Sequence, residues 1–236
     1  MDRRTFLGAS LALSASAAWA RPAAPYRLSL AAYSMRKYLE LKNPTMTLEE
    51  FIVKAADWGC DGVELTEYYF RKPLTPESLM KLKRTAWREG VDITGTPIGN
   101  TFTHPAGEAR EREVSKMRAW IDVSADLGSP AIRIFAGNCP KGVEESQARK
   151  WVVECIEACL PQAEKRGVIL ALENHGGVVA KPEGLLEIVK AVKSDWVGIN
   201  LDGGNFHGED PYAELEACAS LAVTCQVKVE IKPAGN

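Results

Sequence analysis

Two carboxylates stand at the ends of apolar runs that are typical of buried strands. Glu173 directly follows five apolar residues, and Asp202 ends the next such run along the chain. A carboxylate at the end of a buried strand is costly to desolvate unless it meets a cation or a hydrogen-bond donor. Carboxylates from neighbouring strands, flanked by His175 and Asn205, suit a divalent cation with oxygen-rich ligands, such as Mn²⁺, Mg²⁺ or Co²⁺. Such a cation would polarise a substrate carbonyl or hydroxyl.

A structural role stays open for each of these residues. Glu173 and Asp202 could cap the loops that follow them, or pair with Arg133, which alternates with Ile132 and Ile134 in another β-rich run. Arg133 could point into the fold and neutralise the carboxylates, bind an anionic group, or form a structural salt bridge. Two carboxylates at two successive strand ends favour a functional site over two separate caps.

Further polar residues stand at other strand ends. Glu64 could act as an acid or base, hold a substrate hydroxyl, or form an ion pair with a neighbouring strand. The last β-rich run places Gln226, Lys228 and Glu230 on one face, because side chains alternate along a strand. A buried lysine beside carboxylates is a candidate electrostatic catalyst or proton donor.

The elements that would position these residues follow a repeated pattern. Short β-rich runs alternate with longer segments of helical periodicity, and Gly or Pro marks the joins. The pattern predicts seven strands, at 27–33, 62–67, 91–98, 131–136, 168–173, 197–201 and 222–231. It also predicts six intervening helices, the first opened by a capping box at Thr47 and Glu50 and stopped by Gly59, the others at 76–89, 108–127, 144–166, 182–192 and 211–219.

The joins between helices and strands indicate the fold class. Three of them share the pattern Ala-x-x-x-Gly-[Val or Cys]-[Asp or Ile], at 55–61, 86–92 and 163–169, which is the repeated turn that a barrel needs. Strict alternation predicts a parallel sheet, either doubly wound or closed. No Gly-rich phosphate fingerprint follows the first strand, which disfavours the dinucleotide-binding fold. We therefore predict an α/β protein, a (β/α)8 barrel of TIM type whose eighth β/α unit is missing from this chain.

The first twenty residues have the features of an export signal. Paired arginines, Arg3 and Arg4, precede an apolar run, and Ala18-Trp19-Ala20 forms a small-x-small cleavage site. This order predicts a twin-arginine signal peptide at residues 1–20 and a periplasmic or otherwise extracytoplasmic location. The barrel domain is then residues 21–236, incomplete at its C-terminal end.

Charge and cysteine content exclude some classes of partner. Residues 21–236 hold 27 basic and 30 acidic side chains, a formal charge of about −3. We therefore expect neither a nucleic acid nor, after signal removal, a membrane as a partner. The six cysteines form no CxxC pair and no disulfide-scaffold spacing, and we interpret them as small buried hydrophobic residues.

With these residues in hand, the chain from Tyr26 to its end resembles the xylose isomerase-like barrel superfamily. This is the sugar phosphate isomerase/epimerase group, which also includes apurinic endonucleases. The resemblance is carried by four motifs: Asp-Gly-Val-Glu64-Leu, Leu-Glu173-Asn-His175-Gly-Gly, Leu-Asp202-Gly-Gly-Asn-Phe and Gln226-Val-Lys228. It implies a barrel whose active site lies at the carboxyl ends of the strands.

The resemblance implies a metal site that this chain matches in part. Relatives hold the metal with a strand-five Glu, here Glu173, a strand-six Asp, here Asp202, a strand-seven His and a strand-eight Glu. Gln226 stands at the third position, and the fourth lies beyond Asn236. Glutamine offers a carbonyl oxygen but is a weaker ligand than imidazole, which shifts the preference toward harder ions. We expect one divalent ion, Mn²⁺, Mg²⁺ or Co²⁺, with Zn²⁺ as a further candidate.

The function implied is isomerisation or epimerisation of a sugar or keto-sugar by proton transfer next to a carbonyl. Glu173 would act as ligand and base, with His175 and Lys228 stabilising the enediolate. Glu64, Arg133, Asn205 and His207 are the predicted substrate contacts. The partner would be a small carbohydrate, and a homo-oligomer is compatible with the sequence.

Two other functions stay open. One is a lyase or dehydratase of the same superfamily, and the other is a non-catalytic sugar-binding remnant. The endonuclease branch uses a histidine-rich zinc site and is disfavoured, because the chain has three histidines and a slight excess of acidic residues.

Overall fold

The computed structural model describes residues 26–232, so the predicted signal peptide at residues 1–20 lies outside the described part. The strands are β1 (Ser29–Ala31), β2 (Gly62–Glu64), β3 (Asp92–Gly95), β4 (Ala131–Ile134), β5 (Ile169–Glu173), β6 (Val197–Asp202) and β7 (Ala222–Gln226). The longer helices are α3 (Leu48–Asp57), α4 (Pro76–Glu89), α5 (Glu108–Leu127), α6 (Glu145–Arg166), α7 (Pro182–Ala191) and α8 (Pro211–Ala219). Short helical segments are η1 (Ala32–Met35), α2 (Arg36–Leu39), η2 (Glu67–Tyr69) and η3 (Gly177–Val179).

The strands are parallel and run in sequence order. One group pairs β1 with β2 and β2 with β3, and a second group runs from β4 to β7. The two groups join where the chain beyond β3 meets β4: the Thr96 amide donates to the Ala131 carbonyl at 3.1 Å, and the Ile98 amide donates to the Arg133 carbonyl at 3.2 Å. The predicted order of the seven strands is therefore confirmed within residues 26–232.

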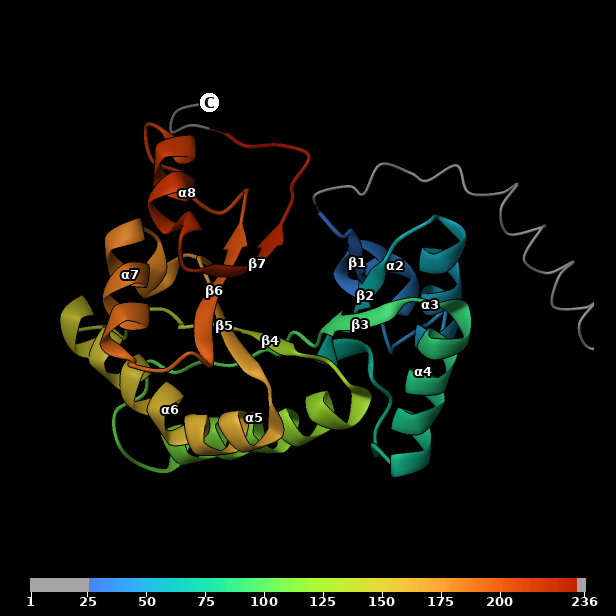
Figure 1. The fold of residues 1–236 in the computed structure, drawn as a ribbon. Coiled ribbons are helices and arrows are strands. Elements are labelled where there is room, and N and C mark those ends of the chain that lie inside the picture. The colour runs from blue at the N-terminus through green and yellow to red at the C-terminus, as the bar shows by residue number, and fades with distance from the viewer. Residues whose placement is uncertain (1–25, 233–236) are drawn as a thin grey trace, which may run out of the picture.

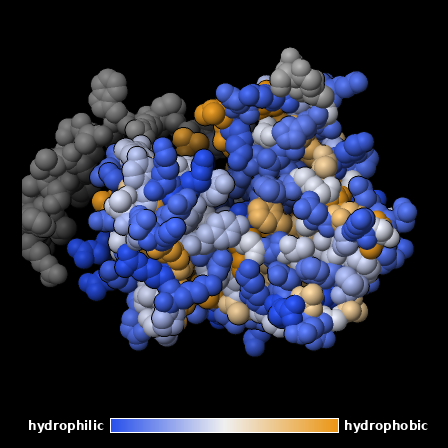
Figure 2. Space-filling view, turned by 180° about the vertical axis from the view of Figure 1, so that it is seen from behind, coloured by the Kyte–Doolittle hydropathy of each residue, from blue (hydrophilic) through white to orange (hydrophobic). Residues whose placement is uncertain are grey.

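The helices lie on the outer side of the strands, as Figure 1 shows, with α3 and α4 over the first group and α5 to α8 over the second. Each helix turns an apolar face inward, and the fully buried side chains include Phe51, Ile121 and Ile156. Figure 2 shows that the opposite side of the molecule is mostly hydrophilic, with apolar residues in small separate groups. No helix of the described part is long and apolar enough to cross a membrane.

The repeated helix-to-strand turns have one geometry. Gly59, Gly90 and Gly167 adopt left-handed backbone conformations, with φ of 76°, 72° and 69°. In each turn the residue after the glycine donates its amide to the carbonyl of the alanine five positions before it, at 3.0–3.1 Å. A side chain other than glycine would be strained there. The predicted capping box is also present, because Thr47 and Glu50 each accept the other's backbone amide.

Six of the seven predicted strands are longer than the strands of the structure, the exception being β6, and β1 and β7 show why. β1 covers only Ser29–Ala31, because the chain turns into η1 at Ala32. β7 stops at Gln226, although the alternating pattern continues to Ile231. Val227 and Val229 are 88% and 104% exposed, and their amides have no strand beside them in the described part. Alternation alone does not extend a strand that lacks a pairing partner.

The cysteines divide between core and surface. Cys155, Cys159 and Cys218 are buried and free, and burial raises the pKa of their thiols to about 11, 12 and 11 respectively. These three fit the predicted role of small hydrophobic residues. Cys225 is exposed, so that interpretation is wrong for the cysteine on β7, whose outer side is unpaired within residues 26–232.

Candidate functional site

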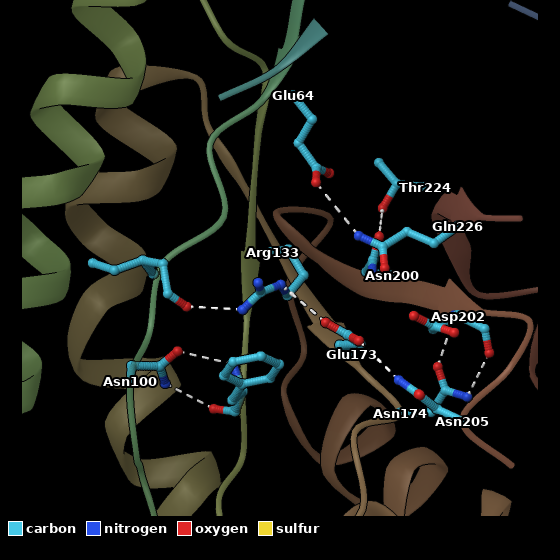
Figure 3. A network of polar contacts seen from close by, with 12 residues as sticks. Glu64, Asn100, Arg133, Glu173, Asn174, Asn200, Asp202, Asn205, Thr224 and Gln226 are labelled. Atoms are coloured by element: carbon cyan, nitrogen blue, oxygen red, sulfur yellow. Dashed lines mark hydrogen bonds and ion pairs between the residues drawn. The ribbon is translucent and has the colours of Figure 1, made fainter. Parts of the chain in front are cut away.

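Six of the predicted site residues meet at the carboxyl ends of the strands. Figure 3 shows them pointing toward one another: Glu64, Arg133, Glu173, Asp202, Asn205 and Gln226. Glu64, Glu173, Asp202 and Gln226 are the last residues of β2, β5, β6 and β7. The pairing register sets Glu173 beside Asn200 and Asp202 beside Gln226. Parallel strands thus bring together side chains that lie far apart in the sequence.

Arg133 and Glu173 form a buried ion pair. Arg133 Nε lies 2.9 Å from Glu173 Oε2, and the two side chains are 9% and 4% exposed. Arg133 Nη1 also donates to the Ile98 carbonyl at 2.9 Å, and its guanidinium carbon lies 3.9 Å from the centroid of the Phe135 ring. Arg133 is therefore held by three groups. It neutralises the carboxylate of Glu173, which is one of the three roles that the sequence left open for it.

The second oxygen of Glu173 is held by an amide. Asn205 Nδ2 donates to Glu173 Oε1 at 2.9 Å. Burial raises the pKa of Glu173 to about 7, although the positive charge of Arg133 acts in the opposite direction, and the negative charge of Asp202 adds to the increase. A carboxylate with such a pKa is suited to accept and return a proton near neutral pH.

Asp202 is anchored in the same way. Its Oδ1 accepts the Gly204 amide at 2.9 Å, and Lys228 Nζ lies 2.8 Å from its Oδ2. Its backbone is held by Asn174, whose side-chain oxygen accepts the Asp202 amide at 2.8 Å and whose side-chain nitrogen donates to the Asp202 carbonyl at 3.0 Å. Sequence reasoning missed Asn174, although a buried asparagine directly after a strand-end carboxylate was a signal that could have found it.

The two glycines after Asp202 let Lys228 approach. The Gly203 amide donates to the Gln226 carbonyl at 2.9 Å. A Cβ on Gly204 would lie 2.7 Å from Lys228 Cγ, closer than side-chain atoms pack. The Gly-Gly pair therefore makes room for the lysine side chain to reach Asp202.

Glu64 and Gln226 meet from opposite sides of the site, as Figure 3 shows. Gln226 Nε2 donates to Glu64 Oε1 at 3.5 Å, a long contact. Burial raises the pKa of Glu64, and the charges of Arg133 and Lys228 oppose that increase. Gly95 makes room for Glu64, because a Cβ at Gly95 would lie 3.1 Å from Glu64 Cγ.

Asn100 is a second asparagine that the sequence did not predict, and it supports Arg133 indirectly through Phe135. Asn100 donates to the Phe135 carbonyl at 2.7 Å and accepts the Phe135 amide at 2.8 Å. This pairing fixes the chain after β4, and with it the ring on which the guanidinium of Arg133 stacks. Asn100 and Asn174 thus use the same reciprocal amide contact at two strand ends.

The two predicted histidines lie beside this cluster, at a pocket of about 400 Å³. His175 and His207 are both exposed and line the pocket with Asn205 and Lys181. The His175 ring packs on Phe135, with 4.4 Å between ring centroids. Partial burial, followed by the charge of Arg133, lowers the pKa of His175, so its imidazole is neutral at neutral pH.

The predicted metal ligands are brought together in part. Glu173 and Asp202 are close enough to affect each other's ionisation. Asp202 Oδ2 is buried and accepts no aligned hydrogen bond. Carboxylate oxygens are the ligands that a hard divalent ion prefers, but Arg133 lies beside one oxygen of Glu173 and Lys228 beside one oxygen of Asp202. Gln226 instead turns its amide nitrogen toward Glu64, and residues 26–232 contain no group of three His, Cys, Asp or Glu side chains arranged to hold a metal.

The fold and this cluster define the class of protein. The chain belongs to the xylose isomerase-like TIM barrel family, whose model matches residues 52–229. No curated protein matches the sequence.

Solved structures give the same fold. A protein from Sinorhizobium meliloti is 26% identical, with a TM-score of 0.60, over 74% of this chain and 62% of its own. This chain therefore spans less than two thirds of that relative. A D-psicose 3-epimerase from Clostridium cellulolyticum, solved with D-tagatose, is 16% identical with a TM-score of 0.71, over 84% of this chain and 71% of its own. A zinc-bound IolI protein is 19% identical with a TM-score of 0.63, over 77% of this chain and 64% of its own.

Proposed function

We propose that the protein is an isomerase or epimerase of a sugar or keto-sugar that acts by proton transfer next to a carbonyl. The proposal depends on one observation: Glu173 is a buried carboxylate whose two oxygens are held by Arg133 and Asn205 at the carboxyl ends of the strands. Membership of a barrel family with an epimerase among its solved structural neighbours supports the same conclusion. Fold alone does not fix the chemistry, so the proposal depends on the site.

Glu173 is the proposed base. Because both of its oxygens are held, the carboxylate is fixed in direction before substrate arrives, which lowers the cost of reaching the transition state. Removal of a proton next to a carbonyl places negative charge on the carbonyl oxygen. Lys228 pairs with Asp202, and its side chain is 41% exposed, so its ammonium is the positive group of this cluster that substrate can reach. It would stabilise the negative charge on the carbonyl oxygen.

A divalent cation would be held by Glu173 and Asp202, with the side-chain oxygen of Gln226 as a third donor after rotation of its amide. When bound, it would polarise the substrate carbonyl. The oxygen-rich donor set favours Mn²⁺, Mg²⁺ or Co²⁺, and Zn²⁺ stays a candidate because a solved neighbour was obtained with zinc. We propose an extracytoplasmic site of action and a small carbohydrate as the partner.

The test is exchange of substrate hydrogen with solvent. We expect deuterium from heavy water to enter a ketose next to its carbonyl, and the Glu173→Gln variant to lose this exchange by about 10²-fold or more, because it cannot accept the proton. Glu157→Gln, at an exposed position on α6, is the control and should exchange as the unaltered protein does. Full exchange in Glu173→Gln would disprove the assignment, and release of water from the substrate without exchange would indicate a dehydratase.

A non-catalytic sugar-binding protein is separated by the same experiment. It would bind the ketose and show no exchange in any variant. A Mn²⁺ titration followed by thermal unfolding adds a second criterion, because a cation that binds the folded state raises its stability by mass action.

A further inference from the structure

Of the pocket beside the predicted base, the chemistry proposed above uses only Asn205. It has a volume of about 400 Å³ and lies where β5 and β6 lead into α7 and α8. That volume falls in the range of about 300–1,000 Å³ typical of small-molecule sites. Its polar lining is formed by His175, Lys181, Asn205, His207 and Glu214.

Asn205 connects the pocket to the reacting centre. The same side chain lines the pocket and donates to Glu173 Oε1 at 2.9 Å. His175 follows Glu173 by two residues and also lines the pocket. A ligand in the pocket would therefore extend from a sugar whose proton-bearing carbon, next to the carbonyl, lies over Glu173.

The lining selects a neutral ligand rich in hydroxyl groups. Lys181 supplies one positive charge and Glu214 one negative charge, so the two balance. Two imidazoles and one amide add both hydrogen-bond donors and acceptors. An anionic substituent would meet the Glu214 carboxylate, and an apolar one would leave these polar groups without partners, which is costly. A sugar ring offers hydroxyls that satisfy donors and acceptors alike.

The wall that carries Glu214 is already fixed. Glu214 Oε2 accepts the Gly208 amide at 3.0 Å. A Cβ on Gly208 would lie 2.3 Å from Glu214 Oε1, so the close approach of the carboxylate depends on glycine. A preformed wall lowers the ordering cost of binding.

We propose that this pocket binds a second sugar ring, so that the substrate is a ketose or keto-sugar that carries a glycosyl group. The proposal deepens the function proposed above and depends on it. The glycosyl group is bound by Lys181, Glu214 and the two histidines, and the reacting sugar lies over Glu173.

The histidines provide a direct test, because the chain contains only three. Protein with ¹³C-labelled histidine is titrated with fructose, with fructose 6-phosphate and with the glucosyl-fructoses turanose, maltulose and isomaltulose. We expect at least one glucosyl-fructose to shift the imidazole signals of His175 and His207, to leave His104 unchanged, and to bind about tenfold more tightly than fructose. The Lys181→Met/Glu214→Gln double variant should lose that advantage, whereas Lys193→Met, an exposed lysine outside the pocket, should keep it.

Three outcomes would overturn the proposal that the pocket binds a second ring. Tightest binding of fructose 6-phosphate would identify an anion site, and equal binding of fructose and every glucosyl-fructose would show that no second ring is recognised. Failure of the proposed function gives a different result: a glucosyl-fructose would shift His175 and His207 while no deuterium entered any ketose. Deuterium exchange without shifts of the His175 and His207 signals would support the proposed function and overturn the proposal that the pocket binds a second ring.

Discussion

At the scale of single residues, the two central carboxylates are held by matched sets of partners. Each has one oxygen on a neutral donor, Asn205 for Glu173 and Gly204 for Asp202, and the other beside a cation. The cations differ in access, because the Arg133 side chain is 9% exposed and the Lys228 side chain 41%. Arg133 therefore sets the charge of Glu173 from inside the protein, whereas Lys228 is open to a substrate.

Replacement of Lys228 by methionine tests this difference. We expect Lys228→Met to lower kcat by about 10²-fold, because it removes a positive group that stabilises developing negative charge. The same change should strengthen Mn²⁺ binding by about tenfold, because it removes a positive charge next to Asp202. Mn²⁺ affinity is measured by equilibrium dialysis. Lys232→Met is the matched control, since Lys232 pairs with Glu230 at the surface. Unchanged Mn²⁺ affinity in Lys228→Met would show that the ammonium does not act on this site.

Loss of Arg133 should act through stability and depend on pH. Arg133→Met leaves Glu173 buried without its cation, which costs about 3 kcal/mol of unfolding free energy above pH 7. At pH 5 Glu173 is protonated in both proteins, because its pKa is about 7 in the unaltered protein and rises further without Arg133, so no buried charge is left unpaired there. The loss should therefore be larger at pH 8 than at pH 5, as measured by urea unfolding.

The Arg133→Met/Glu173→Gln double variant completes the comparison. With no buried charge left unpaired, most of the lost stability should return at pH 8. A double variant as unstable as Arg133→Met would mean that the arginine contributes through its packing on Phe135 rather than through the ion pair.

At the scale of elements, the loops after neighbouring strands support one another. The chain after β4 and the segment η3 after β5 are in contact, because the Val178 amide donates to the Gly137 carbonyl at 3.2 Å. Gly177 lies at this contact with φ of 56°, and a Cβ there would lie 2.2 Å from the Gly137 carbonyl oxygen. The glycine is thus required both by its backbone conformation and by the close approach of another loop.

Two glycine substitutions separate these requirements. Gly142 also has a left-handed conformation, with φ of 79°, but nothing lies within 4 Å of its missing Cβ. Gly142→Ala should cost about 1 kcal/mol from backbone strain alone. Gly177→Ala should cost at least about 3 kcal/mol, because backbone strain and a displaced loop add together. Urea unfolding measures both, and equal losses would show that the contact with Gly137 yields easily.

At the scale of the whole molecule, the barrel brings one end of seven parallel strands to a single site. Its two strand groups are continuous through the contacts between the chain after β3 and β4, so residues from both groups reach the same centre. Within residues 26–232, β1 pairs only with β2 and β7 only with β6. The contact between Gln226 and Glu64 joins the ends of β7 and β2 across the site.

Export is the prediction that concerns the whole chain. If residues 1–20 are a twin-arginine signal, replacement of Arg3 and Arg4 by lysine should keep the full-length protein inside a bacterial host. The unaltered protein should be found outside the cytoplasm and begin at Arg21, as read by N-terminal sequencing. Equal export of both forms would argue against this route.

The sequence by itself determined the order and type of the elements and the strand ends that carry carboxylates. Hydrophobic periodicity, the capping box at Thr47 and the glycine turns are local properties, because each depends on residues only a few positions apart. The positions of Glu64, Glu173 and Asp202 at strand ends followed from the same reasoning.

Only the tertiary structure decided which partner each charged side chain takes. Asn205 reaches Glu173 across 32 positions and Gln226 reaches Glu64 across 162, and such contacts depend on strand register and on where loops fold back. The end of β7 at Gln226 was decided in the same way, because a strand needs a neighbour. The pocket lined by His175 and His207 also required the fold, since its walls come from segments that meet only when the strands pack.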